Sequence, residues 1–223
     1  MAYQVQFEAL TPYIGELVQG LLHTLAYAAS SIVLGMAIGV GGAIALLYGG
    51  KLLCGVIRVY VEFFRNTPAL VQLFLIYFGL PALGLRLDAP LAGVISLALY
   101  CGAYMVEVFR SGLLSVPRGI AEAGAALGLR RRQVLMHVLF VPALRNVFPA
   151  LSSQMVLTLI GTSLISQIGV EDIFHAGSFI DSRTFRSFEV YVVICAMYFV
   201  VVQMLRIVLG FVQRRLFGQP GGR

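Results

Sequence analysis

Long uncharged stretches, mostly apolar, alternate with short charged segments along the chain and set the predicted elements. Five such stretches are candidates to cross a bilayer: 17–50, 66–85, 89–106, 146–170 and 190–205. A helix needs about 20 apolar residues to span the hydrocarbon core. The last stretch is short, and reaches that length if Arg206 extends its side chain toward the surface. The pattern predicts five spans at about 17–48, 66–85, 89–110, 146–169 and 189–211.

Residues 17–50 leave two arrangements open. At about 1.5 Å per residue, a single helix of this length extends past a bilayer. It is either one long tilted helix, bent at Gly41-Gly42, or a helical hairpin. One helix is favoured because two full spans and a turn do not fit. Gly35-x-x-x-Gly39 is typical of helices that approach one another closely.

The composition agrees with a membrane protein. Of the 223 residues, 59% are hydrophobic and 12% are charged, whereas soluble domains carry about 25% charged residues. The mean hydropathy is +0.90. The three cysteines and three histidines are scattered, so we expect neither a disulfide framework nor a metal site. We therefore predict an all-α integral membrane protein with one transmembrane domain over residues 1–223.

The basic residues fall on one side of the predicted membrane. With five spans and the N-terminus outside, 13 of the 16 basic residues lie in inner segments and seven of the ten acidic residues lie outside. Lys and Arg are retained on the cytoplasmic side, which predicts a periplasmic N-terminus and a cytoplasmic C-terminus. This asymmetry accounts for the net charge of +6 without nucleic acid as a partner. The inner basic residues are Lys51, Arg58, Arg65, Arg110, Arg118, Arg130, Arg131, Arg132, Arg145, Arg206, Arg214, Arg215 and Arg223.

The longest inner segment, about 113–145, is predicted to carry a short helix of small residues. Ser115 and Pro117 mark a helix start. Small residues then recur at i, i+3, i+4 and i+7, which places them on one helical face. They are Ala121, Gly124, Ala125 and Gly128. Each glycine costs a helix about 1 kcal/mol against alanine, so we expect an external contact to offset that cost.

Three consecutive arginines, 130–132, are predicted to begin a second helix. Its apolar side is expected to lie against the membrane-embedded part of the chain. That side consists of Val134, Leu135, Val138 and Leu139. Two interpretations of the whole segment are open: a surface that touches another protein, or a basic amphipathic helix resting on anionic lipid.

Several motifs in this order resemble one family. Glu122-Ala123-Gly124, followed by Gly128, an apolar stretch and Pro142, resembles the EAA motif of ABC importer permeases, which docks into the ATPase subunit. Further stretches resemble the polar amino-acid uptake branch of that family, and the resemblance covers nearly the whole chain. These are RVYVEFFRNTPALVQLFLIYFGLP (58–81), GAYMVEVFRSGLLSVPRGIAEAG (102–124), ALRNVFPAL (143–151) and GTSLISQIGVEDI (161–173).

The chain departs from the family pattern at three places. Gly124 stands where a second alanine is usual, and Pro142 falls one position later than expected. Ile160-Gly161 replace a lysine and a polar residue that family members often carry before the Thr-Ser of the fourth span.

The resemblance implies a permease subunit of an ATP-driven amino-acid importer, with a type I fold, in the bacterial inner membrane. Glu122, Ala123, Gly124 and Gly128 would couple the 115–128 segment to the ATPase. The implied partners are a second permease subunit, the same or homologous, two ATP-binding subunits, a periplasmic binding protein, an amino-acid ligand and membrane lipid. ATP and Mg would be bound by the ATPase subunits, and this chain would hold no cofactor. Gly50-Lys51, its nearest match to a phosphate loop, is followed by Leu52.

Polar side chains in the fourth span mark a candidate path for ligand. Gln154, Thr158 and Thr162 share a face at i+4 spacing, and polar groups inside a membrane are often functional. We predict that Thr158, Thr162 and Ser163 line the path, with Gln72 from the second span. The alternative is that the hydroxyls bond back to their own helix or to a neighbour.

Other charged residues receive structural interpretations. Four at the inner membrane edge are expected to form ion pairs that fix the fold: Glu62, Arg65, Glu107 and Arg110. Three outside are expected either to meet the binding protein or to be solvated loop charges: Asp172, Asp181 and Glu189.

A second hypothesis is an ion-coupled secondary transporter of small polar solutes. Such proteins usually have internal repeats and ionisable residues at mid-membrane, and neither is found in the sequence. A membrane scaffold without transport leaves the polar face of the fourth span unexplained. Copurification of an ATPase discriminates between these hypotheses.

Overall fold

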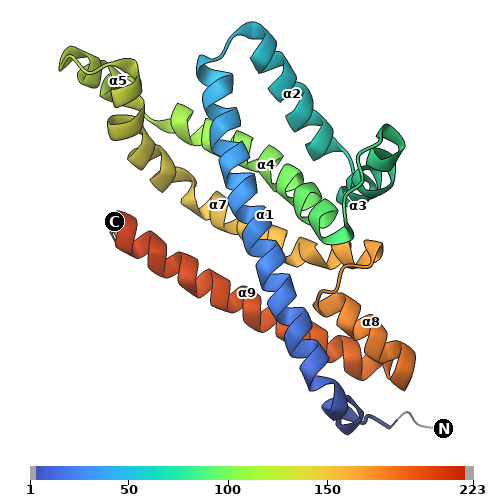
Figure 1. Cartoon of the computed structure of the whole chain (residues 1–223). Helices are drawn as coiled ribbons and strands as arrows, with labels where there is room; N and C mark the ends of the chain where they lie inside the picture. The colour runs from blue at the N-terminus through green and yellow to red at the C-terminus, as the bar shows by residue number, and fades with distance from the viewer. Residues whose placement is uncertain (1–3, 219–223) are drawn as a thin grey trace. The chain divides into compact units, whose positions relative to one another are not determined.

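The computed structural model describes residues 4–218, in which every regular element is helical (Figure 1). Arg223, one of the predicted inner basic residues, lies outside the described residues. In chain order the elements are η1 Phe7–Tyr13, α1 Ile14–Tyr48, α2 Lys51–Asn66, α3 Ala69–Phe74, η2 Leu75–Gly79, η3 Leu80–Leu83, α4 Ala89–Ser115, α5 Arg118–Ala126, α6 Arg131–Gln133, η4 Val134–Leu139, α7 Phe140–Gly161, η5 Thr162–Ile168, α8 Ile173–Thr184 and α9 Ser187–Phe217.

The contacts divide the chain into two compact units. Unit 1 contains residues 4–33, 68–98 and 156–205, and unit 2 contains residues 34–67, 99–155 and 206–218. The long helices α1, α4, α7 and α9 contribute residues to both units.

Within the described residues, four helical segments are long and apolar enough to cross a membrane: Phe7–Tyr48, Ala89–Ser115, Val134–Ile168 and Ser187–Phe217. A fifth span exists if the interrupted pair Lys51–Asn66 and Ala69–Leu83 counts as one. Of this pair, only Ala69–Leu83 falls within the predicted span at 66–85, and the break lies at the edge of that prediction. Proline disfavours the helical conformation in the residue before it, and Thr67, before Pro68, has φ −122° and ψ 149°. The helix that precedes the break begins at Lys51.

The first predicted span is one helix, as favoured from its length. Helix α1 runs for 35 residues, from Ile14 to Tyr48, without a break at Gly41-Gly42 (Figure 1). Its glycines allow close approach to α4 within unit 2. A Cβ atom at Gly39 would overlap Met105, and one at Gly42 would lie 2.5 Å from Val106 Cγ2.

Each unit has its own apolar core. In unit 2, α1, α4 and α7 enclose Ala43, Cys101, Met105, Phe109, Val147 and Leu151. The Tyr60 hydroxyl donates to the Leu99 carbonyl at 2.6 Å, which fastens α2 to α4 in that unit. In unit 1, one cluster comprises Leu73, Ala92, Leu97, Ile165, Ile168 and Val170, and another comprises Leu10, Leu17, Ile180, Val190 and Ile194.

Asp172 is buried in unit 1 and begins α8. Its side chain is fully buried, and Oδ1 accepts a 2.8 Å hydrogen bond from the His175 N–H, an N-cap bond. The Tyr198 hydroxyl donates to Oδ2 at 3.5 Å. Burial raises the pKa of Asp172 to about 6, against the opposing effect of the bond from His175. The expectation that Asp172 is a docking or solvated charge is therefore wrong.

Glu189 is the second buried carboxylate, also with no exposed surface. Its Oε1 accepts from the Gln6 N–H at 2.9 Å and lies 3.6 Å from Arg186 Nη1. The docking or solvated interpretation is wrong here as well, because the carboxylate is fixed inside unit 1. Asp181 is half-buried and accepts a 2.7 Å bond from the Ser187 hydroxyl.

Candidate functional site

Helix α5 is the short helix predicted in the longest inner segment. Its N-cap is Pro117, with φ −56° and ψ 135°. It ends after Ala126 in a glycine turn, where the Gly128 N–H donates to the Ala125 carbonyl at 2.9 Å and the Leu129 N–H to the Gly124 carbonyl at 3.2 Å. Gly128 has φ +80°, a left-handed conformation that glycine adopts at little cost.

The predicted face of small residues is therefore only partly correct. Gly128 lies beyond the end of α5, so it terminates the helix instead of extending the face. Gly124 is on the helix but is buried, facing η4 of the same chain. A Cβ atom there would lie 3.2 Å from Val134 Cγ2 and 3.6 Å from Val138 Cγ2. The close backbone approach that small residues permit therefore occurs between α5 and η4, which together form a helical hairpin of this chain.

The outward side of α5 presents a different set of residues. Glu122, Ala123 and Ala126 are exposed, and Leu127, at the tip of the hairpin, is 81% exposed. A Cβ atom at Gly119 would meet nothing within 4 Å. A partner protein would therefore meet one acidic group, small side chains and a protruding leucine.

The second helix of the segment begins at Arg131 and continues without interruption as α6, η4 and α7 (Figure 1). The Gln133 side chain accepts from the Arg130 N–H at 2.9 Å, which satisfies a free donor at the helix start. Val134 and Leu135 are buried, as expected for the apolar side. Because the helix runs through Arg145, the candidate span begins at Val134 and not near residue 146.

The base of the hairpin is tied to α4. Asn146 Nδ2 donates to the Ser115 hydroxyl at 2.9 Å, and that hydroxyl donates to the Gly112 carbonyl at 2.8 Å. A Cβ atom at Gly112 would lie 3.0 Å from the Ala143 carbonyl oxygen. These contacts connect the hairpin directly to the end of α4. A force applied to the hairpin would therefore be transmitted to that end of α4.

The predicted path residues Thr158, Thr162 and Gln72 are buried in unit 1, and Ser163 is half-buried. The Thr162 hydroxyl donates to the Leu159 carbonyl at 2.8 Å, and the Ser163 hydroxyl to the Ile160 carbonyl at 2.9 Å. These two hydroxyls follow the alternative in which they bond back to their own helix. In this conformation the buried side chains belong to the interior of unit 1.

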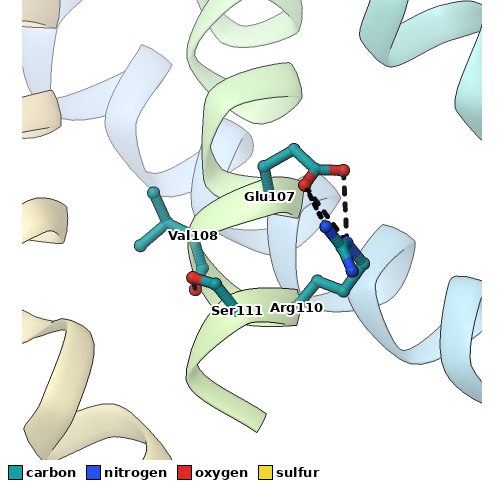
Figure 2. Close-up of polar contacts among 4 residues, drawn as sticks. All are labelled: Glu107, Val108, Arg110 and Ser111. Atoms are coloured by element: carbon teal, nitrogen blue, oxygen red, sulfur yellow. Dashed lines mark hydrogen bonds and ion pairs between the residues drawn. The ribbon is translucent and has the colours of Figure 1, made fainter. Parts of the chain in front are cut away.

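The inner-edge charges behave in two ways. Arg110 and Glu107 form the expected ion pair, one turn apart on α4, at 2.7 Å between Nη2 and Oε2 (Figure 2). Glu62 and Arg65 on α2 form no ion pair within residues 4–218. The Arg65 guanidinium lies instead over the Tyr104 ring, 5.4 Å from its centroid. The expectation of an ion pair is wrong for these two.

Glu62 and Arg65 line a polar cavity of about 270 Å³ in unit 2, together with Val61, Asn66 and Tyr104. It holds a carboxylate, a guanidinium, an amide and a phenol, groups that can bind both ends of a zwitterion. We did not predict this cavity from the sequence. The residue that could have indicated the cavity is Pro68, because it ends α2 and leaves Arg65 and Asn66 in the last turn of that helix.

The chain is similar to known transport proteins over nearly its whole length. Residues 31–218 match the model of the family described as "binding-protein-dependent transport system inner membrane component". The chain is 33% identical to the glutamine transport system permease protein GlnP of Escherichia coli K12, covering 96% of this chain and 98% of the relative. It is 31% identical to the probable glutamine ABC transporter permease protein GlnM of Bacillus subtilis, covering 97% and 98%.

Two solved structures have the same fold. One is a crystal structure of an amino acid ABC transporter with histidines, with a TM-score of 0.87, 33% identity, and coverage of 96% of this chain and 100% of that one. The other is the inward-facing MetNI methionine ABC transporter, with a TM-score of 0.79, 20% identity, and coverage of 92% and 98%. The second likeness concerns the fold alone.

Proposed function

Because the chain belongs to the family of binding-protein-dependent transport system inner membrane components, we propose that it forms the membrane path of an ABC importer for polar amino acids. Members of this family are multi-pass inner-membrane permeases, and the ATPase activity lies in partner subunits. The names of the relatives in E. coli and B. subtilis favour glutamine as the first ligand to test.

The proposed topology has five spans, with the interrupted α2–η3 segment counted as one. The N-terminus lies in the periplasm and the C-terminus in the cytoplasm, following the distribution of basic residues. The single domain pairs with a second permease subunit, and two ATP-binding subunits and a periplasmic binding protein complete the complex.

The hairpin of α5 and η4 is the proposed coupling element, and its geometry is the observation that carries the proposal. Its inner side is fixed by the packing of Gly124 on Val134, and its base by the bond from Asn146 to Ser115. Its outer side presents Glu122, Ala123 and the protruding Leu127. A helix held at its inner side and its base in this way can transmit a displacement that favours one of two conformations of the permease.

The proposed role of each predicted coupling residue follows from its place. Glu122 and Ala123 contact the ATPase subunit, which binds ATP and Mg. Gly124 holds α5 close to η4, and Gly128 allows the turn that ends the helix.

The ligand contacts remain a separate proposal. Glu62 and Arg65, in the polar cavity, are suited to the α-amino and α-carboxylate groups of an amino acid. Thr158, Thr162, Ser163 and Gln72 stay predicted path residues, and they would reach ligand in another conformation of the transport cycle.

Uptake measurements test the function. The chain is expressed in a strain lacking its endogenous glutamine permease, together with its cognate ATPase and binding protein, and uptake of labelled glutamine, histidine, arginine and glutamate is measured. We expect saturable uptake of one or more of these amino acids that stops when a Walker lysine of the ATPase is replaced. Uptake that persists in that ATPase variant but collapses when the proton gradient is dissipated would support the ion-coupled secondary transporter instead.

A further inference from the structure

Unit 2 contains an apolar cavity of about 150 Å³ that the chain itself does not fill. Its lining residues are all apolar, and they include Ala43 from α1, Phe109 from α4, Leu135 from η4 and Ala143 from α7. Protein interiors are normally close-packed, and the two alanines leave this space open. A cavity of such size and lining stays dry and accepts an apolar guest.

The cavity lies where three candidate spans end. Its α1 and α4 residues are in the last turns of Phe7–Tyr48 and Ala89–Ser115, and the rest are in the first turns of Val134–Ile168. The proposed topology places these ends at the cytoplasmic leaflet. An apolar guest in this cavity would extend from the ends of these spans into the region of the lipid acyl chains.

A basic surface adjoins the cavity. Met136, which is 49% exposed, lines the cavity and also a shallow depression formed with Arg132, Gln133 and His137. The depression is lined by no carboxylate, and within residues 4–218 Arg132 forms no ion pair. Arg130, also exposed, adds a second guanidinium at the start of the same helix. Guanidinium groups bind phosphate oxygens through strong, charge-assisted hydrogen bonds.

We propose that this pair of features binds one anionic phospholipid of the inner leaflet, with a segment of an acyl chain in the cavity beside Ala143 and the phosphate beside Arg132. The acyl chain fills space that no side chain occupies, and the guanidinium selects the negative headgroup. Since η4 also packs on Gly124 of α5, the lipid braces the coupling hairpin from behind. This last consequence rests on the proposed coupling role, and the placement in the inner leaflet rests on the proposed topology.

Lipid retention by the purified full chain tests the site. Native mass spectrometry in detergent follows titration with dioleoyl phosphatidylglycerol or with dioleoyl phosphatidylcholine. We expect one phosphatidylglycerol to be retained at about tenfold lower concentration than phosphatidylcholine, the ratio that one charge-assisted bond supports. Arg132→Gln is expected to abolish the preference, and Ala143→Leu to lower retention of both lipids. Arg145→Gln, an exposed arginine that lines neither hollow, is the matched control and is expected to change neither.

A second variant guards against a folding defect in Ala143→Leu. Met136→Glu alters an exposed position and sets a carboxylate beside the headgroup, so it is expected to reject phosphatidylglycerol in a chain with unchanged thermal unfolding. Equal retention of both lipids by the wild type, or wild-type retention by Met136→Glu, would overturn the proposal. So would complete displacement of the lipid by millimolar inorganic phosphate, because that result assigns the surface to a free anion. No ATPase is present, so a negative result here leaves the coupling assignment untouched.

Discussion

Gly124 lies directly against Val134, so closely that a Cβ atom at position 124 would come within 3.2 Å of the valine Cγ2. This contact joins α5 to η4 and sets the shape of the hairpin. It also explains why a short helix tolerates a glycine that costs it stability. The compensation comes from packing within the same chain.

Enlarging Gly124 should therefore loosen the hairpin. Gly124→Leu is expected to cost about 1–3 kcal/mol of local stability through overpacking. Limited proteolysis of the chain in detergent should show faster cleavage near α5. Gly119→Leu is the matched control, because a Cβ atom there meets nothing within 4 Å. Equal protease resistance in both variants would contradict a packing role for Gly124.

A bulky residue on the outward side of α5 should block docking without disturbing the hairpin. Ala126→Trp is expected to insert normally, to lose the ATPase subunit on copurification, and to abolish ATP-dependent uptake. Ala126 is exposed and has ordinary helical geometry, so backbone strain does not enter. In the control, Leu52→Trp, the tryptophan replaces a leucine that is 84% exposed and lies outside the hairpin. ATPase retention by Ala126→Trp would remove this surface from the coupling interface.

Asp172 gives the chain a defined pH dependence. Its pKa is about 6 in the folded chain against the ordinary 3.8, so the folded state holds the proton more tightly. That stabilising contribution is complete below pH 4 and is lost as the pH rises through 6. The difference amounts to about 3 kcal/mol.

Asp172→Asn tests this dependence, because the amide oxygen still accepts the bond from the His175 N–H. Thermal unfolding in detergent should find the variant close to wild type at pH 4.5 and more stable than wild type at pH 7.5. Because His23 and His175 line the cavity beside Asp172 in both proteins, the readout is the difference in stability between variant and wild type at each pH. A constant difference between the two proteins at every pH would refute the buried-carboxylate explanation.

Arg65 and Arg110 should respond differently to the same substitution. Arg65→Gln removes from the polar cavity the guanidinium that lies over Tyr104 and is expected to raise the KM for uptake about tenfold or more, the loss typical of one charged hydrogen bond. Arg110→Gln removes a partly exposed pair with Glu107, and such pairs contribute about 1 kcal/mol or less to stability. The readout is the concentration dependence of labelled amino-acid uptake. Identical kinetics for the two variants would mean that the cavity does not contact ligand.

The long apolar elements of the fold were predictable from the sequence because lipid imposes length and composition on them. The single helix at 14–48 followed from the space that two spans require. The interruption at Thr67-Pro68 was missed because the charge pattern does not register a proline. The helix through Arg145 was missed because a charged residue was taken as the edge of a span, whereas an exposed arginine inside a helix can extend its charged end toward water.

The candidate site was less predictable for a related reason. Periodicity identifies which residues share a face but not what that face packs against, so Gly124 was assigned to a partner and not to Val134. Composition likewise does not show burial of Asp172 or Glu189, because the segments that cover them are distant in sequence. Gln6, for example, reaches Glu189 across 183 positions.

The bond from Gln6 to Glu189 also has a consequence for how the protein is made. The amide leaves the ribosome well before the carboxylate, which is synthesised with α9, 183 positions later. Until that helix is inserted, the segment around Gln6 lacks this contact and unit 1 is incomplete. Polypeptides arrested before α9 should therefore be recognised as unfinished and degraded by membrane proteases.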